Sequence, residues 1–135
     1  MSSGTNSAAC VLAWFTCALA WVVVVMQAGF GALEMFAPRW VFDRVFPGYF
    51  RTRDNPVWFD TEKLAGNMGL YNWFLALGLL LTLVGKLGGA PNSWFFLLCV
   101  AVAGIFGVFS VGPSKAFIAQ LGLGLVTLVL VLLRF

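Results

Sequence analysis

Apolar residues fill four long stretches of the chain, and polar residues gather between these stretches and at their ends. The stretches cover about residues 8–36, 64–84, 93–111 and 114–133. A helix of roughly 20 apolar residues crosses the roughly 30 Å of hydrocarbon in a bilayer. The pattern therefore predicts four transmembrane helices.

The connections between the stretches predict how these helices are arranged. Residues 85–93 and 111–115 form short links that are rich in glycine and proline. Short links force neighbouring helices to run antiparallel, and in lipid every backbone polar group must be bonded within its own segment. We therefore expect an all-α integral membrane protein. Its fold would be an up-down four-helix transmembrane bundle, a single domain over residues 1–135 with a first loop at residues 37–63.

The first loop combines aromatic side chains with arginines and aspartates. This composition is typical of a segment in the headgroup layer, with rings at the boundary and charged groups toward phosphate or water. Prolines divide the loop, so we expect a short helix over residues 38–46 followed by an irregular stretch. A lid over the bundle is the alternative to an interfacial anchor. The expected anchors are Trp40, Tyr49 and Trp58.

Composition and charge support a membrane location. The chain is 61% hydrophobic and 10% charged, too apolar for a soluble domain of this length. Lys86 and Arg134 lie on the side of the second connection, and the other basic residues lie on the opposite side: Arg39, Arg44, Arg51, Arg53, Lys63 and Lys115. The positive-inside rule then predicts a multi-pass protein of the inner (plasma) membrane with both termini away from the cytoplasm. The basic residues are not clustered as in a nucleic-acid-binding module, so we expect no nucleic-acid partner.

Metal ligands are scarce. Histidine is absent, and Cys10, Cys17 and Cys99 lie within predicted spans without a Cys-x-x-Cys motif. This argues against zinc and haem, so we predict no metal site and no cofactor, although a bound lipid or pigment-like apolar molecule stays open. We expect the thiols to be buried as small hydrophobic groups.

Small residues within the spans predict where helices approach each other. Lipid provides no hydrophobic drive between helices, so close backbone contact at glycine and alanine supplies van der Waals attraction instead. The expected packing positions are Gly69, Gly104, Gly107 and Gly122.

Strongly polar residues within the spans gather toward one end of the predicted bundle. Glu34 ends the first span and Asn67 begins the second, so one loop brings them to the same depth. Asn67 and Tyr71 lie one turn apart, and Asn72 lies about 100° further round the helix. Gln120 starts the fourth span on the same side, and Gln27 lies about two turns deeper. The predicted polar cluster is Glu34, Asn67, Tyr71, Asn72, Gln120 and Gln27.

Four segments resemble, in order and spacing, small bacterial four-span proteins grouped as domain of unknown function 1304. The segments are ALEMF (32–36), LAGNMGLYNWFLALGL (64–79), FFLLCVAVAGIFGVFSV (95–111) and the Gln120 that follows KAFIA. The resemblance covers residues 24–133 and implies a four-helix membrane fold but no activity. It marks as pattern residues Glu34, Asn67, Gly69, Tyr71, Asn72, Gly104, Gly107 and Gln120.

The chain departs from the family pattern at Met26 and Gln27, where the resemblance leads us to expect a Glu-His pair. Its first loop is also longer and more aromatic than the pattern. A proton-handling role that depends on a histidine at this place is therefore not expected.

Three functions are open on the sequence. The favoured one is an accessory or structural subunit of a membrane protein complex, in which the polar cluster bonds helices together and the lipid-facing surfaces bind a protein partner or another copy. The second is a binding or transport module for a small apolar molecule with one polar group, held at Glu34, Asn67 and Tyr71. The third is an intramembrane enzyme with Glu34 as general acid or base. No nucleophile with an adjacent base is evident, so the sequence leans against an enzyme without deciding the question.

Overall fold

The computed structural model is all-helical in the residues that it describes, which are 3–45, 56–87, 89, 92–110 and 112–133. The helices are α1 (Ser3–Phe36), α2 (Pro38–Val45), α3 (Pro56–Leu83), α4 (Ser93–Ser110) and α5 (Lys115–Leu132). All but α2 contain a segment long and apolar enough to cross a membrane: Ser7–Phe36, Thr61–Leu83, Ser93–Ser110 and Lys115–Leu132. The predicted all-α fold class is confirmed.

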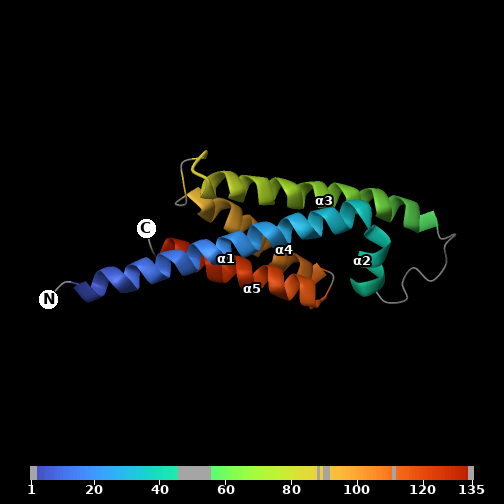
Figure 1. Ribbon diagram of the computed structural model, residues 1–135. Helices are drawn as coiled ribbons and strands as arrows, with labels where there is room; N and C mark the ends of the chain where they lie inside the picture. The colour runs from blue at the N-terminus through green and yellow to red at the C-terminus, as the bar shows by residue number, and fades with distance from the viewer. Residues whose placement is uncertain (1–2, 46–55, 88, 90–91, 111, 134–135) are drawn as a thin grey trace.

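The four long helices alternate in direction and pack as two pairs (Figure 1). α1 packs along α3, and α4 packs along α5, while contacts of α1 with α5 and of α3 with α4 join the two pairs. α2 lies at the end of the bundle where α1 finishes, and the first turns of α1 project beyond the other helices at the opposite end.

Prolines start both helices that follow α1. Pro38 has no N–H to donate to the Glu34 carbonyl four residues earlier, so α1 ends at Phe36 and α2 begins at Pro38. Pro56 likewise occupies the first position of α3, where a missing N–H costs nothing. A short helix was expected over residues 38–46, and α2 ends one residue earlier, at Val45. The first loop was expected to continue to residue 63, but α3 already begins at Pro56 and extends outward beyond the expected second span.

Capping hydrogen bonds end α3 and begin α5. After α3, Gly85 adopts φ +78°, and the N–H groups of Lys86 and Gly85 donate to the carbonyls of Leu81 and Thr82 at 2.8 and 3.0 Å. This paired capping pattern needs a residue with positive φ, which glycine adopts without strain. Before α5, the Ser114 hydroxyl accepts the Phe117 N–H at 3.3 Å and caps the helix.

Glycines allow α1 and α3 to touch. A Cβ atom added at Gly69 would lie 2.7 Å from the Gly31 carbonyl oxygen and 2.6 Å from Met35 Cγ. A Cβ atom added at Gly31 would lie 2.7 Å from the Gly69 carbonyl oxygen. The two backbones therefore meet at this crossing with no room for side chains.

Glycines also allow α4 and α5 to come into close contact. A Cβ atom at Gly104 would lie 2.6 Å from the Leu121 backbone nitrogen, and one at Gly124 would lie 3.1 Å from the Ala101 nitrogen. Gly107 lies against the Phe117 ring. Gly122, expected at a packing position, is exposed with nothing within 4 Å of an added Cβ atom. Gly124 occupies the interface instead, because two residues turn the helix surface by about 200°.

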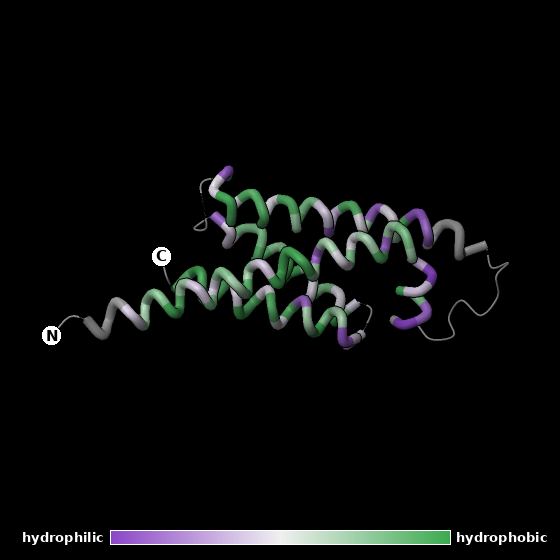
Figure 2. The backbone as a smooth tube through the Cα atoms, viewed as in Figure 1, coloured by the Kyte–Doolittle hydropathy of each residue, from purple (hydrophilic) through white to green (hydrophobic). Residues whose placement is uncertain are grey.

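The apolar core lies toward the end of the bundle away from α2. Buried core residues come from all four long helices: Val23, Val24, Leu79, Leu97, Val100, Leu128 and Val131. Large apolar side chains such as Trp14, Phe36 and Phe109 face outward, as in a helix surrounded by lipid. Hydrophilic residues concentrate at the α2 end of the bundle (Figure 2).

The three cysteines are free thiols. Cys10 and Cys17 are exposed on α1, so the expectation that they are buried was wrong for these two; Cys99 is half-buried. An exposed apolar thiol on a membrane-spanning helix is compatible with a lipid contact, which the sequence pattern does not distinguish from a protein contact.

The α1–α3 crossing can be tested with Gly69→Ala. The added methyl group would meet the Gly31 backbone, which cannot move aside like a flexible side chain, so we expect the free energy of unfolding to fall by about 1–3 kcal/mol. Reversible unfolding in mixed micelles would measure this. Gly66→Ala on the same helix is the control, since it adds a methyl group in open space and should be neutral or stabilising by up to about 1 kcal/mol. Equal effects of the two substitutions would contradict the crossing.

A second pair of variants tests the α4–α5 interface. Gly104→Ala should destabilise the protein by about 1–3 kcal/mol because the Leu121 backbone blocks the new methyl group. Gly122→Ala should cause no loss. A more damaging Gly122→Ala in the same unfolding assay would mean that α5 is rotated differently.

Candidate functional site

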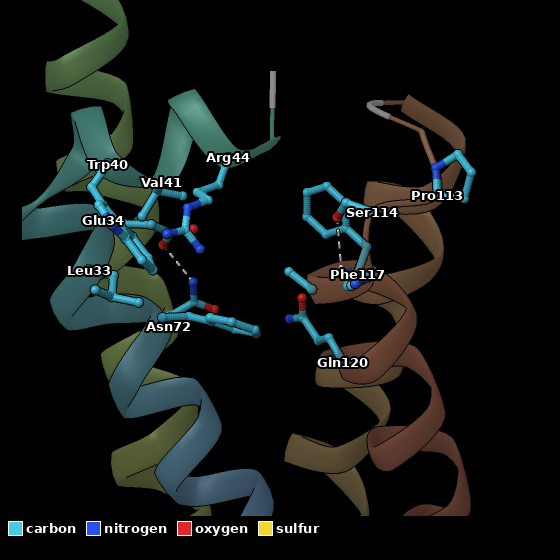
Figure 3. A pocket seen from close by; sticks show the side chains of 13 residues that line it. Leu33, Glu34, Trp40, Val41, Arg44, Asn72, Pro113, Ser114, Phe117 and Gln120 are labelled. Atoms are coloured by element: carbon cyan, nitrogen blue, oxygen red, sulfur yellow. Dashed lines mark hydrogen bonds between the residues drawn. The ribbon is translucent and has the colours of Figure 1, made fainter. Parts of the chain in front are cut away.

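A cavity of about 780 Å³ separates the two helix pairs at the α2 end of the bundle. One wall comes from α1, α2 and α3, and the other from α5 and the turn before it (Figure 3). Its volume falls within the roughly 300–1,000 Å³ of typical small-molecule sites. The lining residues are Phe30, Leu33, Glu34, Trp40, Val41, Arg44, Asn72, Pro113, Ser114, Lys115, Ala116, Phe117 and Gln120.

Glu34 and Asn72 form the polar centre of the first wall. The Asn72 Nδ2 group donates a hydrogen bond of 2.7 Å to Glu34 Oε2, and both side chains are half-buried. The Gly31–Gly69 crossing makes this contact possible, because a Cβ atom at Gly69 would lie only 3.2 Å from Glu34 Cβ. Asn72 follows Gly69 by three residues and thus lies on the same helix face.

Gln120 is the polar group of the opposite wall. It is only 6% exposed, yet its side chain lines the cavity and points into it (Figure 3). No hydrogen bond joins its amide to another residue in the described ranges 3–45, 56–87, 89, 92–110 and 112–133. An amide carries two donor hydrogens and an accepting oxygen, so this wall has unused hydrogen-bonding capacity.

Basic side chains stand at the α2 end of the cavity. Arg44 reaches from α2 over the first wall, and its guanidinium carbon lies 4.6 Å from the centre of the Trp40 ring, a cation–π contact. Lys115 opens α5 on the other wall. Trp40, expected only as an interfacial anchor, is therefore also part of the cavity wall.

Three members of the predicted cluster do not line the cavity: Asn67, Tyr71 and Gln27. Asn67 and Tyr71 are exposed on the outer side of α3, Tyr71 to 58%. The Tyr71 ring lies edge-on to Phe74 with 6.4 Å between ring centres. Of the other expected anchors, Tyr49 and the side chain of Trp58 lie outside the described part of the chain.

Gln27, expected as a member of the polar cluster, lies on α1 beyond the inner end of the cavity. It is fully buried on the same face of α1 as Phe30 and Glu34, but it does not line the cavity. Neither amide atom has a hydrogen-bond partner among the described residues. At this depth the helices have closed around α1, as the burial of Val23 and Val24 shows.

Sequence reasoning missed the basic and aromatic half of the site. Arg44, Lys115 and Phe117 were considered only as loop charges or span residues. One signal could have found them: the first connection and the start of the fourth span lie on the same side of an up-down bundle, so their charges face each other across its end.

The arrangement can hold a molecule that is partly apolar and partly polar. Phe30, Leu33 and Phe117 offer apolar surface, while the carboxyl and amide groups offer hydrogen bonds. The Ser114 hydroxyl accepts the Phe117 N–H as a helix cap.

These features are those of an α-helical multi-pass membrane protein with a cavity at one end of its bundle, whose mostly apolar walls carry a few polar and charged groups. The chain belongs to the family described as "Protein of unknown function (DUF1304)", whose model matches residues 9–132, and the resemblance drawn from the sequence motifs is thereby confirmed. No curated protein and no solved structure shows significant similarity to the chain.

A double-mutant cycle can measure the Glu34–Asn72 contact. We expect Glu34→Ala and Asn72→Ala to show a coupling of about 0.6–2 kcal/mol in the free energy of unfolding, as for hydrogen bonds between membrane helices. The matched cycle with Asn67→Ala should give a coupling near zero, because Asn67 is exposed outside the cavity. A larger coupling to Asn67 than to Asn72 would contradict the rotation of α3.

Proposed function

We propose that this membrane protein binds a small amphiphilic molecule in the cavity between its two helix pairs. The observation that carries the proposal is Gln120, a residue only 6% exposed whose side chain faces the cavity and has no hydrogen-bond partner among the described residues. Its amide group offers two donor hydrogens and an accepting oxygen to a polar group of a bound molecule. A cavity with mostly apolar walls and a few convergent polar groups is the usual form of a small-molecule site.

The position of the one hydrogen bond in the cluster supports a ligand role over a purely structural one. The Glu34–Asn72 bond joins α1 to α3, which the glycine crossing already holds together. Within the described residues, no side-chain hydrogen bond in the cavity crosses from this wall to Gln120 on α5. Polar groups that served only to join helices would be expected to bond across the gap between the pairs.

A second proposal is the accessory subunit that the sequence favoured. The first half of α1 supports it, since the first turns of this helix project past the other helices (Figure 1) and exposed large apolar residues follow at Val11, Trp14 and Phe15. A partner protein or a second copy of the chain could cover them. A stable co-purifying protein that dissociates on Trp14→Ser would support this proposal, while a lone chain in native mass spectra would count against it.

The basic residues near the cavity indicate toward which side of the membrane it opens. The end of the bundle with the cavity also carries Arg39, Arg44 and Lys115, and the positive-inside rule favours the cytoplasm for such an end. The cavity would then open toward the cytoplasmic leaflet of the plasma membrane, and both termini would face away from it.

The binding proposal can be tested by filling the cavity. Ala116 lines the cavity, whereas Ala119 on the same helix is exposed and does not. We expect Ala116→Trp to abolish the retention of a small amphiphile during purification in mild detergent, because the indole occupies the site. Native mass spectrometry of the released mass would detect this.

Ala119→Trp is the control with the same added side chain on the outside of α5. It should retain the molecule. A protein that carries no small molecule from its own membrane in either form would overturn the binding proposal, as would equal loss in both variants with folding intact.

A further inference from the structure

Two cations converge on the cavity from different elements. Arg44 belongs to α2 and Lys115 to α5, and both line the cavity at its α2 end. The Trp40 ring holds the Arg44 side chain in place through the 4.6 Å cation–π contact. Because the two helices belong to opposite walls, the two charges face a shared space.

The start of α5 adds partial positive charge in the same place. Ser114, Lys115 and Ala116 all line the cavity, and they form the N-cap and first two positions of a helix of 18 residues. The Ser114 side chain accepts one of the free N–H groups, that of Phe117. The N–H groups of Lys115 and Ala116 remain at the positive end of the helix dipole, where an anion is stabilised.

Gln120 gives an independent sign that this end of α5 meets a ligand. It lies about one and a half turns from the helix start, or roughly 8 Å along the axis. The residue is almost fully buried, and its side chain has no hydrogen-bond partner within the described ranges and is aimed into the cavity (Figure 3). A ligand held at the start of α5 would bring its next polar atoms to this depth.

The single acid in the cavity does not reverse the sign of the site. Glu34 is the only acidic residue among the lining residues, against Arg44 and Lys115. One of its carboxyl oxygens accepts the Asn72 amide, so part of its charge is already compensated within the wall. A cationic ligand in the cavity would meet two basic side chains and one partly compensated acid.

We propose that the bound molecule is an anionic amphiphile. Its carboxylate or phosphate binds Arg44, Lys115 and the start of α5, a deeper hydroxyl or ester group bonds Gln120, and its apolar chain lies against Phe30, Leu33 and Phe117. This inference rests on the proposed function and specifies the chemical class of the ligand.

Four probes with the same chain length test the inference. The protein is placed in nanodiscs of phosphatidylcholine, and binding of dodecyl phosphate, dodecanoate, dodecanol and dodecylammonium is measured against empty discs to remove simple partitioning. We expect the two anions to bind at least about tenfold more tightly than dodecanol, as charge-assisted hydrogen bonds do, and dodecylammonium to bind most weakly.

Matched variants assign the preference to the cavity. Arg44→Gln combined with Lys115→Gln should bring the affinities for anion and alcohol close together. Lys63→Gln combined with Lys86→Gln removes the same net charge from exposed residues outside the cavity and should leave the preference intact. All four positions are exposed, so these substitutions should not prevent folding, and the melting temperature checks this.

The outcomes separate this inference from the proposed function. Saturable binding of all four probes without an anion preference would overturn the inference and leave the binding function standing. The same holds for a preference for dodecylammonium, or for an anion preference that survives loss of Arg44 and Lys115. Absence of saturable binding by any probe would overturn both proposals.

The source of the anion follows from the molecule that the protein retains from its native membrane. The mass of an anionic glycerophospholipid together with tighter binding of dodecyl phosphate would assign a phosphate headgroup. A free fatty acid mass together with tighter binding of dodecanoate would assign a carboxylate. Either result supports the inference, and a retained neutral or cationic lipid would overturn it.

Discussion

Helix packing in this protein depends on backbone contact at glycine, because lipid is as apolar as the side chains and gives helices no hydrophobic reason to associate. The Gly31–Gly69 crossing makes one pair, and Gly104 and Gly124 make the other. Each pair is thus fixed by atoms that cannot rearrange easily. The polar residues of the cavity on α1, α3 and α5 thus belong to two helix pairs whose internal geometry depends on these few glycines.

The joining of the two pairs is uneven along the bundle, and this unevenness creates the cavity. Toward the far end from α2, core residues such as Leu79, Leu97 and Val100 are fully buried and fill the space between the pairs. Toward α2 several of the facing residues are polar or charged, and the pairs stand apart. The apolar half therefore joins the two pairs, while the polar half leaves a cavity between them.

Position along the bundle axis was predictable from the sequence, but rotation about the helix axes was not. The lengths of the apolar runs and links gave the four spans and brought Glu34, Asn72 and Gln120 to one level. The cluster was also expected to include Asn67 and Tyr71, which α3 turns outward. Gly69 faces α1, so Asn72, three residues later, shares its face, while Asn67 and Tyr71, two residues before and after, do not. Several glycines were candidates for the interface, as Gly122 and Gly124 also illustrate, and only the three-dimensional packing selects among them.

The unequal lengths of the helices have a consequence for the surrounding bilayer. The apolar segment of α1 has 30 residues, whereas α4 and α5 have 18 residues each. At 1.5 Å per residue these correspond to about 45 Å and 27 Å, on either side of the roughly 30 Å of hydrocarbon. A membrane cannot match both, so α1 must tilt or rise out of the hydrocarbon while lipid beside α4 and α5 thins. A thicker bilayer would therefore reduce the mismatch at α1 while it increases the mismatch at α4 and α5, and a thinner one would do the reverse.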